Sequence, residues 1–157
     1  MLKNRTVLST KLNVLFLCGW YPSKILPNNG DFIQRHAEAV SLNHTVKVIH
    51  IITDKAVKKN IEYANEQING IETHTAYLNY YNNPIKKIVV FIKAFKVLLK
   101  RCGPIDVVHL NEIFPFGVFS LYLKWFRKKP YIISEHFTGY HYPQSKNIKF
   151  LQKFISS

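Results

Sequence analysis

The sequence has few cysteines and no long apolar run. Its two cysteines, Cys18 and Cys102, are too few for the disulfide framework of a small secreted domain, and no CxxC pair is present to hold zinc. No stretch approaches the roughly 18 consecutive apolar residues that a membrane-spanning helix needs. We therefore expect a reduced, cytoplasmic protein.

Acidic residues are also scarce. The chain has 22 Lys and Arg against 9 Asp and Glu, which gives a formal net charge of +13. Such an excess favours an anionic partner, which can be nucleic acid, a phosphorylated substrate or an acidic membrane surface, or it is simply a solvated surface. No helix-turn-helix, zinc-finger or RNP-type pattern is present, so nucleic acid is not the expected partner.

Several familiar catalytic motifs are missing as well. The chain contains no GxGxxG, no P-loop and no GxSxG nucleophile elbow. It has no DxD, and His136 with His141 lacks a third metal ligand at suitable spacing. These absences argue against a dinucleotide site, a P-loop and a serine nucleophile, and we expect no metal cofactor.

What is present is an alternation of apolar strands and amphipathic helices. The 157 residues are 47% hydrophobic, enough for one domain with its own core. We expect residues 54–67 to be irregular or weakly helical, and residues 68–78 to hold one strand. The pattern predicts an α/β, Rossmann-like, doubly wound and mostly parallel sheet over residues 1–157. The expected strands are 11–18, 45–53, 105–110 and 130–134. One helix is expected to follow Asp31, and the others are expected at 84–101, 114–126 and 144–154.

The first helix has a recognisable start. Asp31 is expected to cap it, with Gln34 as the reciprocal partner three residues on. Ile33, Ala37 and Val40 recur at i, i+4 and i+7, which predicts a buried stripe on this helix.

Three segments with unusual chemistry follow the expected strand ends at Cys18, His109 and Ser134. The first contains Gly30, which is compatible with a phosphate at a helix N-terminus and equally with a plain turn. The second contains Asn111 and Glu112, which either meet sugar hydroxyls or solvate a turn. The third is Glu135-His136, which is followed by aromatic residues that include Tyr140. Ligands of doubly wound sheets bind at the carboxyl ends of strands, so these loops form the predicted site.

Taken together, three stretches resemble the N-terminal domain of family-4, group-1 retaining glycosyltransferases, which have the GT-B fold of two Rossmann-like domains. The stretches are WYPSKILPNNGDFIQRHAEAV, IDVVHLNEIFPFGVFSLYL and KKPYIISEHFTGY. They occur in the family's order and spacing between about residues 11 and 142. The resemblance implies transfer of a sugar from a nucleotide-sugar donor, with retention and without a metal.

The resemblance also implies roles for individual residues. Gly30, with Asn29 where many members have a second glycine, matches the loop that approaches the donor diphosphate. His136 matches the histidine that lies by the transferred sugar and helps catalysis. Glu112 is an acceptor-side candidate, while Asn111 stands where the family often has histidine. Glu135 and Tyr140 complete the predicted acceptor-binding set.

The family's second domain, which supplies most nucleotide contacts, has no counterpart in the sequence. No Glu-x7-Glu motif is present. We therefore expect a C-terminal donor-binding domain to be supplied in cis or in trans, and this chain to be incomplete and inactive alone.

The helix expected at 84–101 is strongly basic. Its apolar side is expected at Ile88, Phe91, Ile92, Phe95 and Leu99, and it has no acidic residue. Such a helix can lie on an anionic membrane, and it can equally be a core helix with solvated lysines. In the first interpretation, the enzyme lies on the cytoplasmic face of the membrane and its acceptor is a lipid-linked glycan. The residues expected to contact the membrane surface are then Lys86, Lys87, Lys93, Lys96, Lys100 and Arg101.

Overall fold

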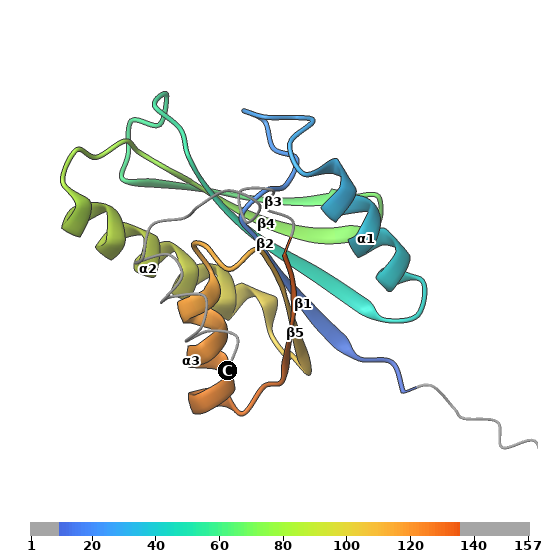
Figure 1. Ribbon diagram of the computed structural model, residues 1–157. Coiled ribbons are helices and arrows are strands. Elements are labelled where there is room, and N and C mark those ends of the chain that lie inside the picture. Colours follow the sequence, from blue (N-terminus) through green and yellow to red (C-terminus); the bar gives the residue numbers. More distant parts are fainter. Residues whose placement is uncertain (1–9, 136–157) are drawn as a thin grey trace, which may run out of the picture.

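The computed structural model describes residues 10–135 as a six-stranded sheet with helices on both faces (Figure 1). The strand order is β3-β4-β2-β1-β5-β6, and all neighbours are parallel except β3 and β4. This is the predicted Rossmann-like, mostly parallel sheet. The elements are β1 Asn13–Cys18, α1 Asp31–Ser41, β2 Thr45–Thr53, β3 Ile61–Ile68, β4 Ile71–Leu78, α2 Pro84–Cys102, β5 Val107–Asn111, α3 Gly117–Arg127 and β6 Tyr131–Ser134.

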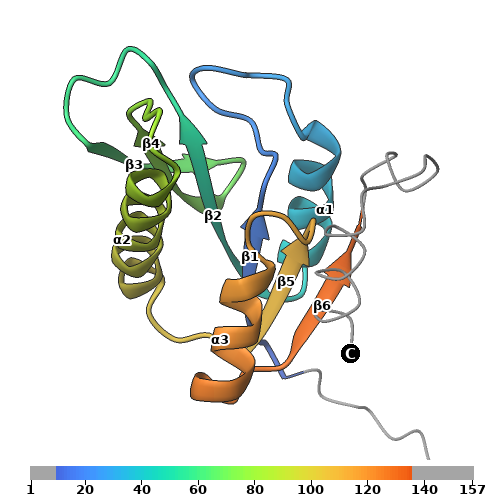
Figure 2. The ribbon, with the colours of Figure 1, turned by 60° about the vertical axis from the view of Figure 1, so that its left-hand side comes forward.

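Helix α1 covers one face of the sheet, while α2 and α3 cover the other (Figures 1 and 2). Ile33 and Ala37 of α1 are buried and pack with Phe16 of β1 and Val48 of β2. On the opposite face, Phe95 of α2 belongs to a larger cluster of buried residues that includes β1, β2, β4 and β5. The near-continuous apolar strands follow from this two-sided burial.

The segment after β2 corrects the sequence prediction. Residues 54–67 were expected to be irregular, yet Ile61–Ile68 forms β3, the antiparallel edge strand. Asn69 and Gly70, at φ 49° and 81°, form the turn of a β3–β4 hairpin. Glu62 and Glu66 on β3 are exposed, which explains why the strand has a weak hydrophobic pattern.

The start of α1 also differs from the prediction. Gly30 precedes the helix with left-handed backbone, and no side chain caps it. Asp31 is the first helical residue instead, and its Oδ2 pairs with the Arg35 guanidinium at 2.8 Å. Gln34 donates to Glu38 rather than to the helix start. The capping-box prediction is therefore wrong.

Helix α2 begins as predicted at Pro84, after a cap by Asn83, whose Oδ1 accepts from the Ile85 and Lys86 amides at 2.9 and 3.1 Å. Its buried side was predicted in part, because Phe95 is buried and Phe91 and Leu99 pack against the core. Ile88 and Ile92 are exposed. The residues that the helix buries against the core are Val90, Ala94, Phe95, Leu98 and Cys102. No helix within residues 10–135 is long and apolar enough to cross a membrane.

Candidate functional site

The chemically unusual residues meet at the carboxyl ends of the central strands. Cys18 of β1 is in register with His50 of β2 and Asn111 of β5, and Asn111 is in register with Ser134 of β6. From β1 the chain crosses to β2 on one side, and β5 lies on the other side. The strand order thus reverses between β1 and β5, which is where ligands of doubly wound sheets bind. The carboxyl ends of β1, β5 and β6, after which the three predicted loops begin, therefore lie side by side.

Gly30 has a structural reason to be glycine. Its φ is +73°, and a Cβ there would lie 2.7 Å from the Trp20 carbonyl carbon and 2.9 Å from the Tyr21 nitrogen. The loop that connects β1 to α1 therefore folds back directly against the helix start. The Ile33 and Gln34 amides donate to the Gly30 carbonyl at 3.0 and 3.1 Å.

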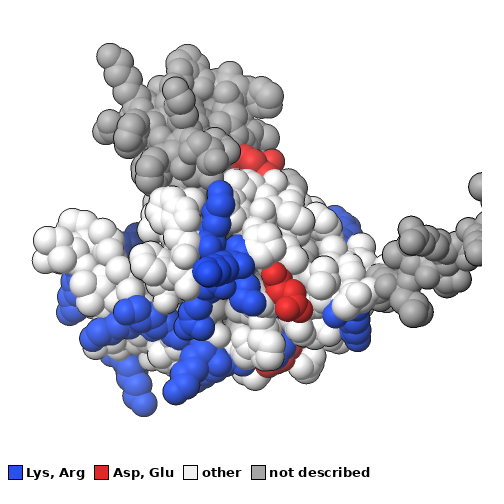
Figure 3. Space-filling model, turned by 90° about the horizontal axis from the view of Figure 1, so that it is seen from below, with Lys and Arg blue, Asp and Glu red and all other residues white. Residues whose placement is uncertain are grey.

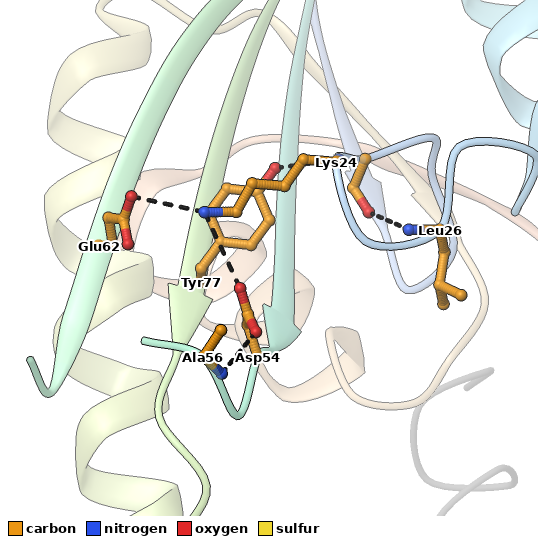
Figure 4. Close-up of polar contacts among 7 residues, drawn as sticks. Lys24, Leu26, Asp54, Ala56, Glu62 and Tyr77 are labelled. Carbon is orange, nitrogen blue, oxygen red and sulfur yellow. Dashed lines mark hydrogen bonds and ion pairs between the residues drawn. The ribbon is translucent and has the colours of Figure 1, made fainter. Parts of the chain in front are cut away.

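Lys24 anchors this same loop to the sheet (Figure 4). Its Nζ lies 4.1 Å from the Tyr77 ring centre, 3.4 Å from Glu62 Oε1 and 3.8 Å from Asp54 Oδ2. The Lys24 amide also donates to the Tyr77 hydroxyl at 3.4 Å. No sequence pattern indicates this anchor, because its members are separated by up to 53 residues.

Glu112 occupies an uncommon position just after β5. Its φ is +79°, a left-handed conformation that is rare for a residue other than glycine. Its amide donates to the Ser134 carbonyl at 3.0 Å, so the turn after β5 is bonded to the neighbouring strand β6. Gly19 lies directly against its carboxyl group, because a Cβ on Gly19 would meet Glu112 Oε2.

The environment of Glu112 changes its acidity. The side chain is buried, and its Oε1 has no hydrogen-bond partner among the described residues. Burial, and then the nearby charge of Glu135, raises the pKa of Glu112 from 4.5 to about 7. The Glu135 carboxylate in turn accepts from the Ile113 amide at 3.0 Å. A carboxyl group with a pKa near 7 can both donate and accept protons around neutrality.

A pair of histidines lies on the α1 side of the sheet. His109 Nε2 lies 2.8 Å from Ser134 Oγ, and the His36 ring packs edge-on against it with centroids 4.8 Å apart. His109 is buried. The sequence analysis did not single out His36 or Ser134, although both lie in stretches that carry the family resemblance.

Two other buried polar side chains, Asn111 and His50, lie on the strands on either side of Cys18. Asn111 Nδ2 donates to the His109 carbonyl at 3.4 Å, and Asn111 Oδ1 has no partner within residues 10–135. His50 Nδ1 lies 3.0 Å from the Cys18 carbonyl, and burial lowers the pKa of His50. His50 therefore stays neutral at pH 7. Asn111 is buried at the carboxyl end of β5.

Two predicted site residues, His136 and Tyr140, lie outside the described residues, although Glu135 shows where the chain leaves β6. In the part of the chain that is described, no three His, Cys, Asp or Glu side chains are grouped so as to hold a metal ion.

The basic residues of α2 do not all lie on one surface. Lys96 and Lys100 line a groove between α2 and α3. Lys86 lies over the Tyr81 ring, 4.5 Å from its centre, and Arg101 lies over the Tyr63 ring on β3 at 4.7 Å. Lys87 and Lys93 are exposed.

The arrangement of strands and loops matches a known glycosyltransferase fold. Sucrose-phosphate synthase from Thermosynechococcus elongatus superimposes with a TM-score of 0.50 and 13% sequence identity, over 92% of this chain and 40% of that one. The chain thus spans less than half the length of that enzyme and shares the Rossmann-like fold of a GT-B glycosyltransferase. No curated protein matches the sequence.

The family model of Glycosyltransferase Family 4 matches residues 34–156, so the chain belongs to that family as an N-terminal domain. The resemblance found in the sequence is thereby confirmed.

Proposed function

We propose that this domain holds the acceptor in a reaction that transfers a sugar from a nucleotide-sugar donor, with retention of the anomeric configuration. The observation that supports the proposal most is the position of Glu112. It is a buried carboxyl group with a pKa near 7, at the strand-order reversal, in contact with the loop that leads to Gly30. The acceptor is a glycan or a lipid-linked glycan.

The residues proposed to bind the diphosphate of the donor are Gly30 and Asn29. The N-terminus of a helix favours an anion, because its backbone N–H groups point outward and its dipole is positive there. Asp31 would oppose a diphosphate at that position, but its carboxylate is paired with Arg35. The absence of a side chain at Gly30 lets the backbone of Trp20 and Tyr21 pack directly against the start of α1.

The residues proposed to bind the acceptor are Glu112, Asn111, Glu135 and Tyr140. A half-ionised Glu112 can accept a hydrogen bond from an acceptor hydroxyl or donate one to its oxygen. Glu135 supports this arrangement, because it raises the Glu112 pKa and holds the Ile113 amide. Asn111 offers an oxygen that has no partner among the described residues.

His136 follows Glu135 directly and is the proposed catalytic residue beside the transferred sugar. The donor-binding domain is proposed to come from another segment, in cis or in trans, so that this chain alone does not turn over. No metal is assigned to the reaction.

The test uses the protein that includes a donor-binding domain. Transfer of labelled sugar is measured with a panel of nucleotide sugars and glycan or lipid-linked acceptors. We expect His136→Ala to lower turnover by at least about a hundredfold, the usual contribution of a positioned proton-transfer group. Wild-type turnover in that variant would remove the catalytic assignment.

The matched control is His44→Ala. His44 lies just before β2, at the amino end of the strand and away from the site, where its Nδ1 accepts from the Leu12 amide at 3.4 Å. This variant should keep turnover within about threefold, because His44 touches no proposed site residue. Equal losses in both variants would show a folding effect instead of catalysis.

A second candidate function rests on the charge of +13, which suits a non-catalytic module that binds an anionic ligand. No sugar transfer with any donor, together with tight and salt-sensitive binding to nucleic acid, would favour it.

A further inference from the structure

Helices α2 and α3 share a side of the molecule that is rich in positive charge. Together with the two residues after α3 they contain ten of the 22 Lys and Arg of the chain, of which Arg101 faces the Tyr63 ring on β3, and residues 84–105 and 113–134 contain no Asp or Glu. Figure 3, which views the molecule from below, shows far more blue than red side chains on this side.

The same side exposes a stripe of large apolar residues. On α2 the stripe is Ile85, Ile88, Val89 and Ile92, each between 36% and 71% exposed. Their spacing of i, i+3, i+4 and i+7 places them on one side of the helix, next to the side that packs into the core. The core therefore does not account for them.

Helix α3 carries a matching stripe. Val118, Tyr122, Trp125 and Phe126 recur at i, i+4, i+7 and i+8 and are 40% to 74% exposed. Exposed apolar side chains are normal when single, but a contiguous patch of them marks an interaction surface.

A groove of about 990 Å³ lies between the two helices and connects these stripes. We call it the α2–α3 groove. It is lined by apolar residues from both helices, among them Ile92, Phe95, Val118 and Tyr122. Four cations also line it: Lys96, Lys100, Arg127 and Lys129.

We propose that this face docks on a bilayer that contains acidic phospholipids. The exposed apolar side chains enter the acyl region, and the cations around the groove contact the phosphate groups of the lipids. Charge complementarity selects this occupant. A second copy of the chain would bring two positive faces together, and a nucleic-acid backbone offers nothing to the apolar stripes.

Docking in this way leaves the candidate site open. The site lies at the carboxyl ends of the strands, and α2 and α3 flank the sheet (Figures 1 and 2). The bilayer would thus lie beside the sheet and not over the site. The inference is independent of the identity of the donor and acceptor.

The test measures binding of the full chain to vesicles of phosphatidylcholine with or without phosphatidylglycerol. We expect co-sedimentation with the anionic vesicles only, weakened by salt. The variant Trp20→Phe leaves Trp125 as the one tryptophan of the chain. Its fluorescence should shift to the blue with anionic vesicles, because Trp125 enters the interface.

Two double variants test the two parts of the face. Lys96→Gln with Lys100→Gln should lower the partition coefficient about tenfold, because it removes two cations from the groove. Ile88→Gln with Ile92→Gln should abolish the blue shift at Trp125 and lower sedimentation. Circular dichroism establishes that each variant is folded.

The matched control is Lys58→Gln with Lys59→Gln, which removes the same charge from the exposed β2–β3 loop. It should leave the partition coefficient within about twofold, because neither Lys58 nor Lys59 lines the α2–α3 groove. An equal loss in the control would overturn the proposed docking face, because it would show that binding depends only on the net charge of the chain.

Three further outcomes would overturn the proposal. They are equal sedimentation with neutral and anionic vesicles or none with either, a dimer that Ile88→Gln with Ile92→Gln disrupts, and binding to duplex DNA with no change in Trp125 emission on vesicles.

Discussion

Gly19 of the β1–α1 loop lies directly against the carboxyl group of Glu112, which follows β5. The two residues are 93 positions apart in sequence and come together only because β1 and β5 are paired in the sheet. This contact joins the proposed donor loop to the proposed acceptor residues, and it keeps water from one side of the Glu112 carboxyl group.

Glu112 should make stability depend on pH in a defined direction. Because its pKa is about 7 in the folded state and near 4.5 unfolded, the folded protein holds more protons between these values. The contribution of Glu112 to the free energy of unfolding is therefore greatest below pH 4.5 and falls by about 3 kcal/mol as pH rises to 7. Urea unfolding of wild type and Glu112→Gln across pH 4–8 measures the difference.

The comparison with Glu112→Gln is needed because buried histidines act in the opposite direction. Burial lowers the pKa values of His50 and His74, so their contribution falls as pH drops below 6.5. Their effect is the same in both proteins and cancels in the difference. A difference that does not change with pH would contradict the raised pKa of Glu112. Glu66→Gln, at an exposed position on β3, is the control.

Gly30→Ala should destabilise the domain more than Gly70→Ala. Both glycines have positive φ, so alanine costs about 1–2 kcal/mol at each. Only Gly30 has backbone atoms of Trp20 and Tyr21 in the place of a Cβ, which adds about 1–3 kcal/mol of overpacking. Denaturant midpoints measure both, and equal losses would contradict the close approach at Gly30.

Lys24→Met should loosen the β1–α1 loop without unfolding the domain. The Lys24 side chain is about half exposed, so its ion pairs and its contact with the Tyr77 ring together contribute about 1 kcal/mol. Hydrogen exchange at the Leu26 and Asn29 amides, which are bonded within this loop, should accelerate about fivefold. Lys59→Met, exposed on the β2–β3 loop, should leave these rates unchanged.

Asn83→Ala should destabilise the start of α2. The Asn83 side chain accepts from two backbone amides, and losing such a cap costs about 1 kcal/mol. Thermal unfolding measures the loss, with the exposed Asn65→Ala on β3 as control. If both variants melt alike, the cap does not contribute.

The sequence predicted most of the sheet because its central strands are buried on both faces and stand out as apolar runs. It failed at β3, where an edge strand needs few apolar residues. The Asn69-Gly70 pair was the available signal for that hairpin. It succeeded only in part on α2, because this helix has apolar residues on two sides, and periodicity alone does not tell which side meets the core.

The candidate site was predicted as three loops but not as a set of contacts. Glu112 was chosen from its place after a strand. Its raised pKa depends on burial, on Glu135 and on a left-handed backbone, and none of these can be read locally. The contacts of Gly19 and Lys24 likewise depend on partners far away in sequence.

The polarity of β3 has a consequence for assembly. In the described part of the chain β3 is paired on one side only, with β4, so it presents a row of backbone amides and carbonyls. Its outer residues include Glu62, Asn65, Glu66 and Gln67, all exposed. A second strand that tried to extend the sheet there would have to place its own side chains beside these carboxylates. The carboxylates of β3 therefore protect this antiparallel edge from fibril-like growth.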